Sequence, residues 1–214
     1  MIFGEEFENR DPRMFQTVRC PGYARIGKTH DVNRLYEAMI ISTTGYMPIK
    51  YIQSGDYDKQ TSNENDIILY RYAEVLLNYA EAKAELGTLL QTDLEQSIKL
   101  IRDRVGMPNM DMAAANANPD PVLSAQYPLV SGSNKGVILE IRRERRVEMV
   151  MENLRYDDII RWKAGHLFTE QFKGVYFSTV TAPSTKYDLD KPAYTARNAN
   201  FYICLLYTSD AADE

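Results

Sequence analysis

Apolar residues recur with helical spacing between Gly136 and Gly165. Two sets of them fall on different sides of a helical wheel: Ile138, Ile141 and Met149 on one side, and Leu139, Val147, Val150 and Leu154 on another. A helix that is apolar in two directions is expected to be covered on two sides. The pattern therefore predicts a buried helix that breaks near Asn153, because asparagine tolerates the left-handed conformation, and a shorter helix from Tyr156 to Ala164.

The same stretch is strongly charged, with six arginines and six acidic residues between Glu140 and Arg161. Arg145 falls on the side of the first apolar set, one turn from Glu148. Buried charges must be paired and hydrogen-bonded, so this placement predicts a structural seam of salt bridges inside a helical assembly. Its members are Arg145, Glu148, Glu152, Arg155, Asp158 and Arg161. The alternative is a solvated helix with weak pairs between neighbouring turns. Neither interpretation is catalytic.

Residues 66–86 carry the clearest single apolar stripe in the chain: Leu69, Tyr72, Ala73, Leu76, Tyr79, Ala80 and Ala84. Asp66 is the expected N-cap and Gly87 the expected left-handed stop. A capping box over Thr92–Glu95 predicts a second helix that runs to Val105. Two helices joined by a short turn, with small residues at their contact, predict a helical hairpin of tetratricopeptide type over residues 66–105.

One such hairpin does not bury a continuous core alone, since about three or more must stack. No second copy is visible, so further repeats are degenerate or the chain is a fragment. Residues 1–65 are rich in turn signals, and residues 107–135 are expected to form a long connection. Short strands are expected at Phe15–Val18, Met47–Ile52, Gly174–Val180 and Phe201–Ile203. Residues 203–214 read as a disordered or non-native tail.

Composition narrows the functional classes. The net charge of −5 argues against nucleic-acid binding, which requires a basic surface. No apolar run approaches the length of a membrane span, and the N-terminus lacks the pattern of a signal peptide. The two cysteines, Cys20 and Cys204, lack metal-ligand spacing. Asp188 and Asp190 have a spacing that could contact a calcium ion, but the glycine and the glutamate of an EF-hand loop are missing. We therefore predict no metal site, and we predict no cofactor.

The sequence offers no catalytic constellation. The two histidines stand apart, and no serine elbow or phosphate loop is present. Most carboxylates lie beside arginines, which lower a carboxyl pKa and so disfavour a general acid. Trp162 could stack on a sugar, but its place at the end of an amphipathic helix favours a core anchor.

Tyrosines in the N-terminal loops are the candidate ligand contacts. The chain has 15 tyrosines against one tryptophan. Tyr23, Tyr36 and Tyr46 are the weak candidates for a binding surface, with Tyr51 and Tyr57 on the same segment. Ordinary packing is the alternative for each of them.

Three blocks in order resemble the SusD/RagB family, the outer-membrane nutrient-binding lipoproteins of Bacteroidetes. They are FENRDPR at Phe7–Arg13, LYRYAEVLLNYAEA at Leu69–Ala82, and ERRVE at Glu144–Glu148 followed by RYDDIIRW at Arg155–Trp162. Their order and spacing are similar to the C-terminal half of that family, over about residues 5–202. The family's lipoprotein signal, lipidated cysteine and earlier repeats have no counterpart here.

The resemblance implies a mostly α-helical fold of tetratricopeptide-like hairpins with long irregular loops and a few short strands. Residues 1–202 would be the C-terminal part of such a domain, with residues 136–165 as its arginine-rich helices. It further implies a surface-exposed protein of the outer membrane, held only by a lipid anchor missing from this chain. Such a protein partners a TonB-dependent, SusC-like transporter and captures oligosaccharides or peptides. A tetratricopeptide-like interaction scaffold without a small ligand is the alternative, and a hydrolase is a distant third.

Overall fold

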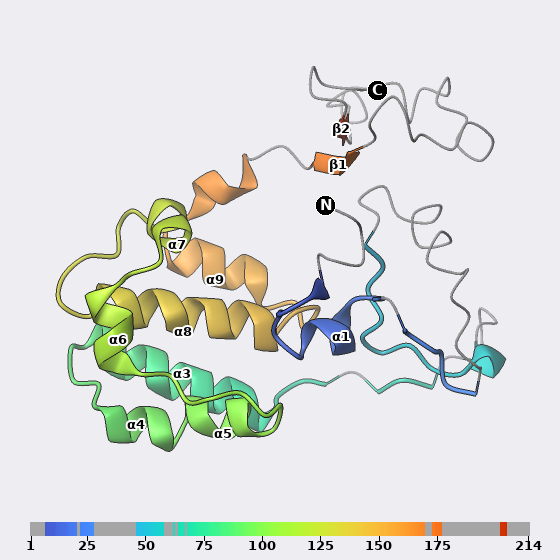
Figure 1. The fold of residues 1–214 in the computed structure, drawn as a ribbon, viewed down its shortest axis with the longest axis horizontal. Coiled ribbons are helices and arrows are strands. Elements are labelled where there is room, and N and C mark those ends of the chain that lie inside the picture. Colours follow the sequence, from blue (N-terminus) through green and yellow to red (C-terminus); the bar gives the residue numbers. More distant parts are fainter. Residues whose placement is uncertain are drawn as a thin grey trace. The chain divides into compact units, whose positions relative to one another are not determined.

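The computed structural model describes residues 7–20, 22–27, 46–57, 62, 64–66 and 68–169, together with two short strands. The fold is mostly helical, as predicted (Figure 1). The helices are α1 (Met14–Thr17), α3 (Tyr72–Glu85), α4 (Gln91–Glu95), α5 (Ile98–Asp103), α6 (Met112–Ala117), α7 (Pro121–Gln126), α8 (Lys135–Glu148) and α9 (Arg155–Arg161). Single 3₁₀ turns lie at Gly55–Tyr57 and Gly165–Phe168. Among the described residues, no helix combines the length and the apolarity needed to cross a membrane.

The chain divides into two compact units. The first contains residues 1–8, 18–63 and 170–214, and the second, here called the helical unit, contains residues 9–17 and 64–169. In the first unit, Val18 pairs with Pro48 in an isolated antiparallel bridge. The strand expected at Phe15–Val18 is wrong, because Met14–Thr17 form helix α1, and the strand expected at Met47–Ile52 is reduced to this single bridge. Strands β1 (Lys173–Tyr176) and β2 (Tyr202–Cys204) pair antiparallel, close to the two C-terminal strands that the pattern predicted.

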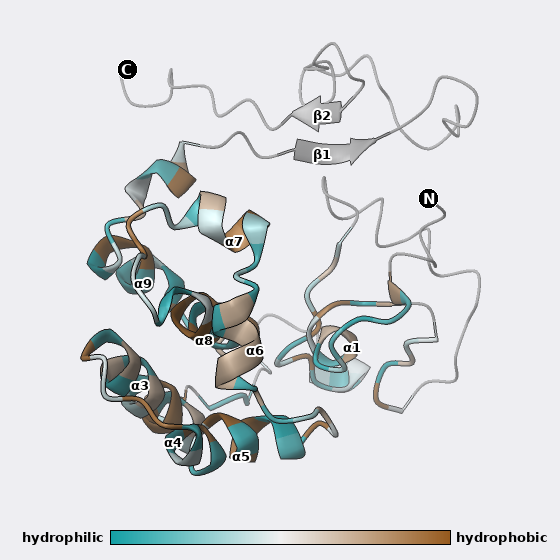
Figure 2. Ribbon diagram, turned by 60° about the vertical axis from the view of Figure 1, so that its left-hand side comes forward, coloured by the Kyte–Doolittle hydropathy of each residue, from teal (hydrophilic) through white to brown (hydrophobic). Residues whose placement is uncertain are grey.

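Helix α8 is the centre of the helical unit. It packs against α3 on one side and against α6 and α7 on others, and its hydrophobic residues lie inside this group of helices (Figure 2). Val137, Leu139 and Ile141 are fully buried. The prediction that this helix is covered in more than one direction is confirmed.

Helix α3 starts later and faces differently than predicted. Arg71, in an extended conformation, precedes the first turn, so the helix does not begin at Asp66. Leu69 and Tyr72 belong to the predicted apolar stripe, but Tyr72 is 67% exposed and Leu69 more so. The buried face instead centres on Leu77 and includes Glu81. The Glu81 carboxylate can be buried because it accepts a hydrogen bond from Arg161 of α9. The predicted left-handed stop is confirmed, since Gly87 has a φ of +70°.

The second predicted helix is broken in two. Helix α4 begins at Gln91, and the Asp93 carboxylate accepts a hydrogen bond from the Leu90 backbone N–H at 2.8 Å, so the Thr92–Glu95 capping box is wrong. The backbone of Ser97 is not helical, and its buried hydroxyl donates to the Asp93 carbonyl at 2.6 Å. This side-chain bond competes with the helical pattern and separates α4 from α5.

The expectation of a long connection over residues 107–135 is also wrong, because α6 and α7 lie within it. Each helix is capped by an aspartate. Asp111 accepts from the Ala114 N–H at 2.9 Å, and Asp120 accepts from the Leu123 N–H at 2.9 Å. These caps stabilise short helices that lack strong apolar periodicity.

The break after α8 lies where the sequence predicted it. Asn153 has a φ of 62°, and Met151 is also left-handed with a φ of 63°. The chain reverses there, and α9 packs back so that its first-turn carboxylate at Asp158 meets Arg145 of α8. The turn therefore decides which charges of the two helices come together.

Candidate functional site

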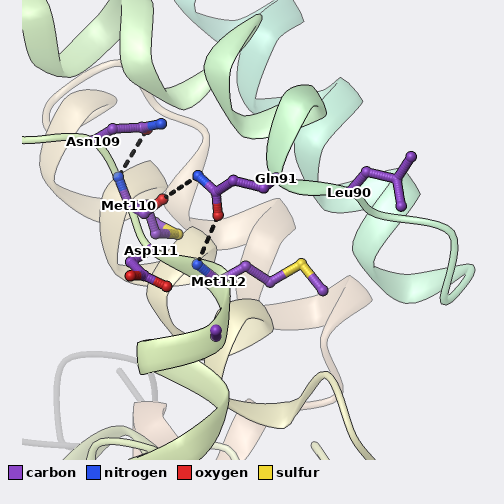
Figure 3. A pocket seen from close by; sticks show the side chains of 7 residues that line it. Leu90, Gln91, Asn109, Met110, Asp111 and Met112 are labelled. Carbon is purple, nitrogen blue, oxygen red and sulfur yellow. Dashed lines mark hydrogen bonds between the residues drawn. The ribbon is translucent and has the colours of Figure 1, made fainter.

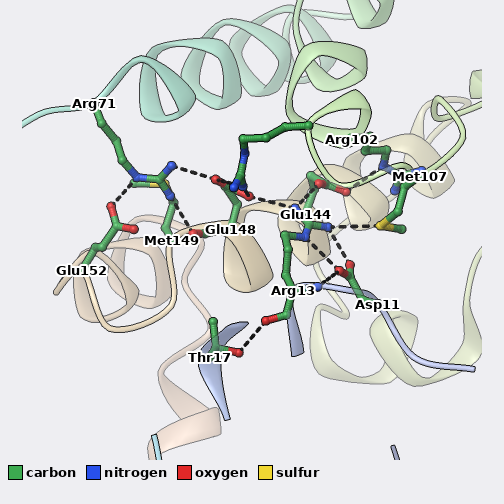
Figure 4. A network of polar contacts seen from close by, with 11 residues as sticks. Asp11, Arg13, Thr17, Arg71, Arg102, Met107, Glu144, Glu148, Met149 and Glu152 are labelled. Carbon is green, nitrogen blue, oxygen red and sulfur yellow. Dashed lines mark hydrogen bonds and ion pairs between the residues drawn. The ribbon is translucent and has the colours of Figure 1, made fainter. Parts of the chain in front are cut away.

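Two clusters of buried charge organise the helical unit. The first, here called the Glu148 cluster, gathers four acids and four arginines at the C-terminal end of α8: Asp11, Arg13, Arg71, Arg102, Arg104, Glu144, Glu148 and Glu152 (Figure 4). The Glu148 side chain is only 1% exposed and receives Arg13 at 3.0 Å, Arg71 at 2.7 Å and Arg104 at 2.9 Å. These three arginines come from three separate segments of the chain.

Arg13 comes from the FENRDPR block and is buried beside two acids of α8. Its Nη1 donates to Glu144 at 2.5 Å and to Glu148 at 3.0 Å, and its Nε donates to Asp11 at 2.9 Å. Burial alone would lower the pKa of Arg13, but the hydrogen bonds to Asp11 and Glu144 raise it above its ordinary value. The guanidinium stays charged, so Arg13 forms ion pairs with these carboxylates whenever they are ionised.

The second group, here called the Asp158 cluster, lies between α3, α8 and α9: Asn78, Glu81, Arg145, Asp158, Arg161 and Trp162. Arg145 is 5% exposed, and its Nε donates to both oxygens of Asp158 at 2.8 Å. Its Nη1 donates to the Asn78 side chain at 2.6 Å. The ion-pair partner of Arg145 is thus Asp158 rather than Glu148, which sequence spacing placed one turn away.

The six residues of the predicted seam are therefore divided. Glu148 and Glu152 belong to the Glu148 cluster, whereas Arg145, Asp158 and Arg161 belong to the Asp158 cluster. Arg155 lies in neither and donates to the Tyr127 hydroxyl at 3.0 Å. Arg13, which the charge pattern did not single out, is a central member, and its contact with α8 is not visible in local spacing.

Trp162 is a core residue. It is 6% exposed, its indole N–H donates to Glu81 at 2.6 Å, and its ring meets that of Tyr127 edge-on at 5.6 Å. Three guanidiniums lie within 6 Å of the indole ring: Arg142, Arg155 and Arg161. A ring enclosed in this way is not a platform for a sugar.

Glu81 gives the helical unit a defined response to acid. Burial alone would raise its pKa, but hydrogen bonds from Arg161 and Trp162 lower it below the ordinary value. The stability from this group is complete above the unfolded-state pKa of about 4.3 and is lost as the pH falls through the lower folded-state pKa.

We therefore expect urea midpoints of the helical unit to fall below about pH 4.3. The Glu81→Gln variant should show a shallower decline, because its amide does not titrate. The measurement is urea unfolding followed by circular dichroism across the acidic range. Equal slopes for the two proteins would assign the acid response to other carboxylates.

Described residues of the helical unit line two grooves, and one of these grooves lies over the Asp158 cluster. One lies beside Gln91 and has a volume of about 530 Å³ and a mainly apolar lining, including Leu90, Met110 and Met112 (Figure 3). Gln91 spans its wall by donating to the Met110 carbonyl at 2.9 Å and accepting from the Met112 N–H at 3.0 Å. The other, of about 480 Å³, runs between α3 and α9 over the Asp158 cluster.

The candidate tyrosines lie in the first unit. Tyr23 is half-buried and Tyr46 is exposed, whereas Tyr36 lies outside the described residues. Tyr51 and Tyr57 are exposed on the same segment as Tyr46. Hydrogen bonds connect the 22–27 and 46–57 segments. The Arg25 side chain donates to the carbonyls of Gln53 at 2.9 Å and Ser54 at 3.1 Å. In the described part of the chain, no group of histidine, cysteine and acidic side chains could hold a metal ion.

A comparison with models of protein families identifies the family of this chain. The profile of the SusD family matches residues 1–211, nearly the whole chain. This chain belongs to the SusD family. The match extends into the segment expected to be a tail, and no curated protein matches the chain.

Two solved structures of SusD-like proteins, both from Bacteroides fragilis NCTC 9343, are similar. One is a SusD-like carbohydrate binding protein, with 26% sequence identity, a TM-score of 0.61 and coverage of 92% of this chain. The other is a SusD-like protein with 27% identity, a TM-score of 0.58 and coverage of 83%. The chain spans 37% and 32% of their respective lengths. The SusD-like helical fold is thereby confirmed.

Proposed function

We propose that this chain is part of a non-enzymatic nutrient-binding subunit that captures oligosaccharides at the outer-membrane surface. Its partner would be a SusC-like, TonB-dependent transporter, and a lipid anchor would hold it to the membrane. Membership of the SusD family carries this proposal, and the carbohydrate-binding relative from Bacteroides fragilis supports it. A peptide ligand is the closest variant of the same function.

The tyrosines of the 22–27 and 46–57 segments are the proposed ligand contacts. Tyr46, Tyr51 and Tyr57 expose parts of their rings, and an aromatic side chain offers a large rigid contact surface at little entropic cost. Tyr51 has a φ of 69°, a left-handed conformation that is costly for a bulky residue. Such strain gathers at ligand-binding loops, so Tyr51 joins Tyr23, Tyr36 and Tyr46 as a candidate.

We expect an oligosaccharide array to yield at least one ligand for this chain. The Tyr46→Ala and Tyr51→Ala variants should each weaken that binding about tenfold, which corresponds to about 1.4 kcal/mol. Tyr70→Ala is the matched control, because Tyr70 is also exposed but lies in the helical unit. Isothermal titration of the array hit measures the affinities. Equal losses in all three variants would remove the loop tyrosines from the proposal, and a folded protein that binds no glycan would favour peptide capture.

A protein-interaction scaffold is the second candidate, favoured by the exposed face of α3. Apolar residues occur there at alternating spacings of three and four: Tyr72, Val75, Tyr79, Ala82 and Leu86. This is the spacing with which one helix packs along another. A Val75→Asp variant that loses binding to a protein partner while retaining its glycan affinity would support the scaffold function.

A further inference from the structure

The contacts of Glu148 join two points that lie far apart along the chain. Arg13 stands just before α1, where the chain leaves the helical unit, and Arg71 stands just before α3, where it has returned. Both guanidiniums bond to the same carboxylate, Arg13 to Oε2 at 3.0 Å and Arg71 to Oε1 at 2.7 Å (Figure 4). The 14–70 segment is therefore flanked by two residues that contact one side chain.

Arg13 and Arg71 each have hydrogen-bond partners in addition to the Glu148 carboxylate. Arg71 also donates to the Glu148 carbonyl at 2.7 Å and to Glu152 at 2.7 Å. The carbonyl belongs to the last turn of α8, where such groups lack helical partners and a cation is favourable. Arg13 is fixed in the same way by Asp11 and Glu144. Each guanidinium is thus oriented before it meets Glu148, which limits the entropy lost in the contact.

We infer that Glu148 closes the 14–70 segment by holding its two ends together through Arg13 and Arg71, and so stabilises the folded form of the tyrosine-bearing loops within that segment. Closing a long segment costs entropy, and buried, charge-assisted hydrogen bonds are strong enough to offset part of that cost. That these loops bind an oligosaccharide rests on the proposed function, whereas the closure does not.

Hydrogen exchange of the complete chain tests the closure without any ligand. Glu148→Gln keeps the shape of the side chain and removes its charge. We expect amides in residues 22–27 and 46–57 to exchange about 10- to 100-fold faster, while amides of α3 and α8 keep their rates. The matched control is Glu140→Gln on the same helix, where the carboxylate pairs with Arg143 at 3.2 Å.

Two further variants separate closure from a local structural role. Arg13→Gln and Arg71→Gln should each accelerate the same amides, and the double variant should add little, because releasing either end opens the segment. Purely local roles would give additive effects that remain near each substitution. These variants also keep the proposal testable if the Glu148→Gln protein does not fold.

Three results would overturn the inference. They are unchanged exchange in Glu148→Gln, equal acceleration of α3, α8 and the loops, and additive effects of the two arginine substitutions. None of them bears on whether the chain binds a glycan, because the experiment contains none. Failure of the closure and failure of the proposed function are therefore distinguishable.

Discussion

Replacing Arg145 with methionine is expected to destabilise the helical unit by about 3 kcal/mol. The substitution removes the ion pair to Asp158, whose side chain is only 4% exposed, and the hydrogen bond to Asn78. Asp158 keeps Arg161 at 2.7 Å, which holds the loss at the lower end of the range for a broken buried pair. Urea unfolding followed by far-ultraviolet circular dichroism measures the change.

Arg146→Met is the matched control for this experiment, because Arg146 is the next residue on α8 and is exposed. It should change the free energy of unfolding by less than about 0.5 kcal/mol. Adding Asp158→Asn to the Arg145→Met protein should recover part of the loss, since it removes the under-compensated buried charge. Equal stabilities of the Arg145→Met and Arg146→Met proteins would contradict a structural role for the Asp158 cluster.

Gly136→Ala is expected to destabilise the protein by about 2 kcal/mol or more, although alanine is normally the better helix former. A Cβ at Gly136 would lie 1.8 Å from the carbonyl oxygen of Ala115 and 2.4 Å from its carbonyl carbon. Both atoms are backbone of α6, so no side chain can rotate to make room. Close approach of α6 to α8 also places Asn116 where it accepts from the Val137 N–H at 2.8 Å.

Gly165→Ala provides the comparison. Apart from its two chain neighbours, no atom of the described residues lies within 4 Å of a Cβ built at Gly165, and its backbone is not left-handed. Alanine there should be neutral or slightly stabilising, because it reduces the freedom of the unfolded chain. Thermal unfolding of the two variants side by side measures the difference. A Gly136→Ala protein as stable as the Gly165→Ala protein would mean that α6 moves away at little cost.

Local signals in the sequence were sufficient for several elements of the fold. The apolar spacing of residues 136–165 identified a buried helix, and Asn153 identified the left-handed turn that follows it. Gly87 marked the end of α3 for the same stereochemical reason. Helices α6 and α7 could not be predicted from apolar periodicity, because each has six residues and few of these are buried. The aspartates at 111 and 120, with Pro121 at a first helical position, were the signals that could have found them.

The partners of the buried charges were harder to predict from the sequence. Spacing along one helix suggested Glu148 for Arg145, but the left-handed turn after α8 brings Asp158 to that arginine instead. Glu148 instead pairs with arginines from distant segments of the chain, above all Arg13 and Arg71. Nothing in the local sequence specifies such contacts, because they depend on how the segments pack. The buried face of α3 was misplaced for a similar reason, since Glu81 is drawn inward by Arg161.

The single tryptophan of the chain lies within the Asp158 cluster, which makes the protein its own optical probe. Indole fluorescence depends on nearby charge and on water, and here the ring is enclosed by Arg142, Arg155 and Arg161. Excitation at wavelengths absorbed only by tryptophan avoids the many tyrosines. A red shift of the emission would therefore signal the entry of water between α3 and α9, without any label attached to the molecule.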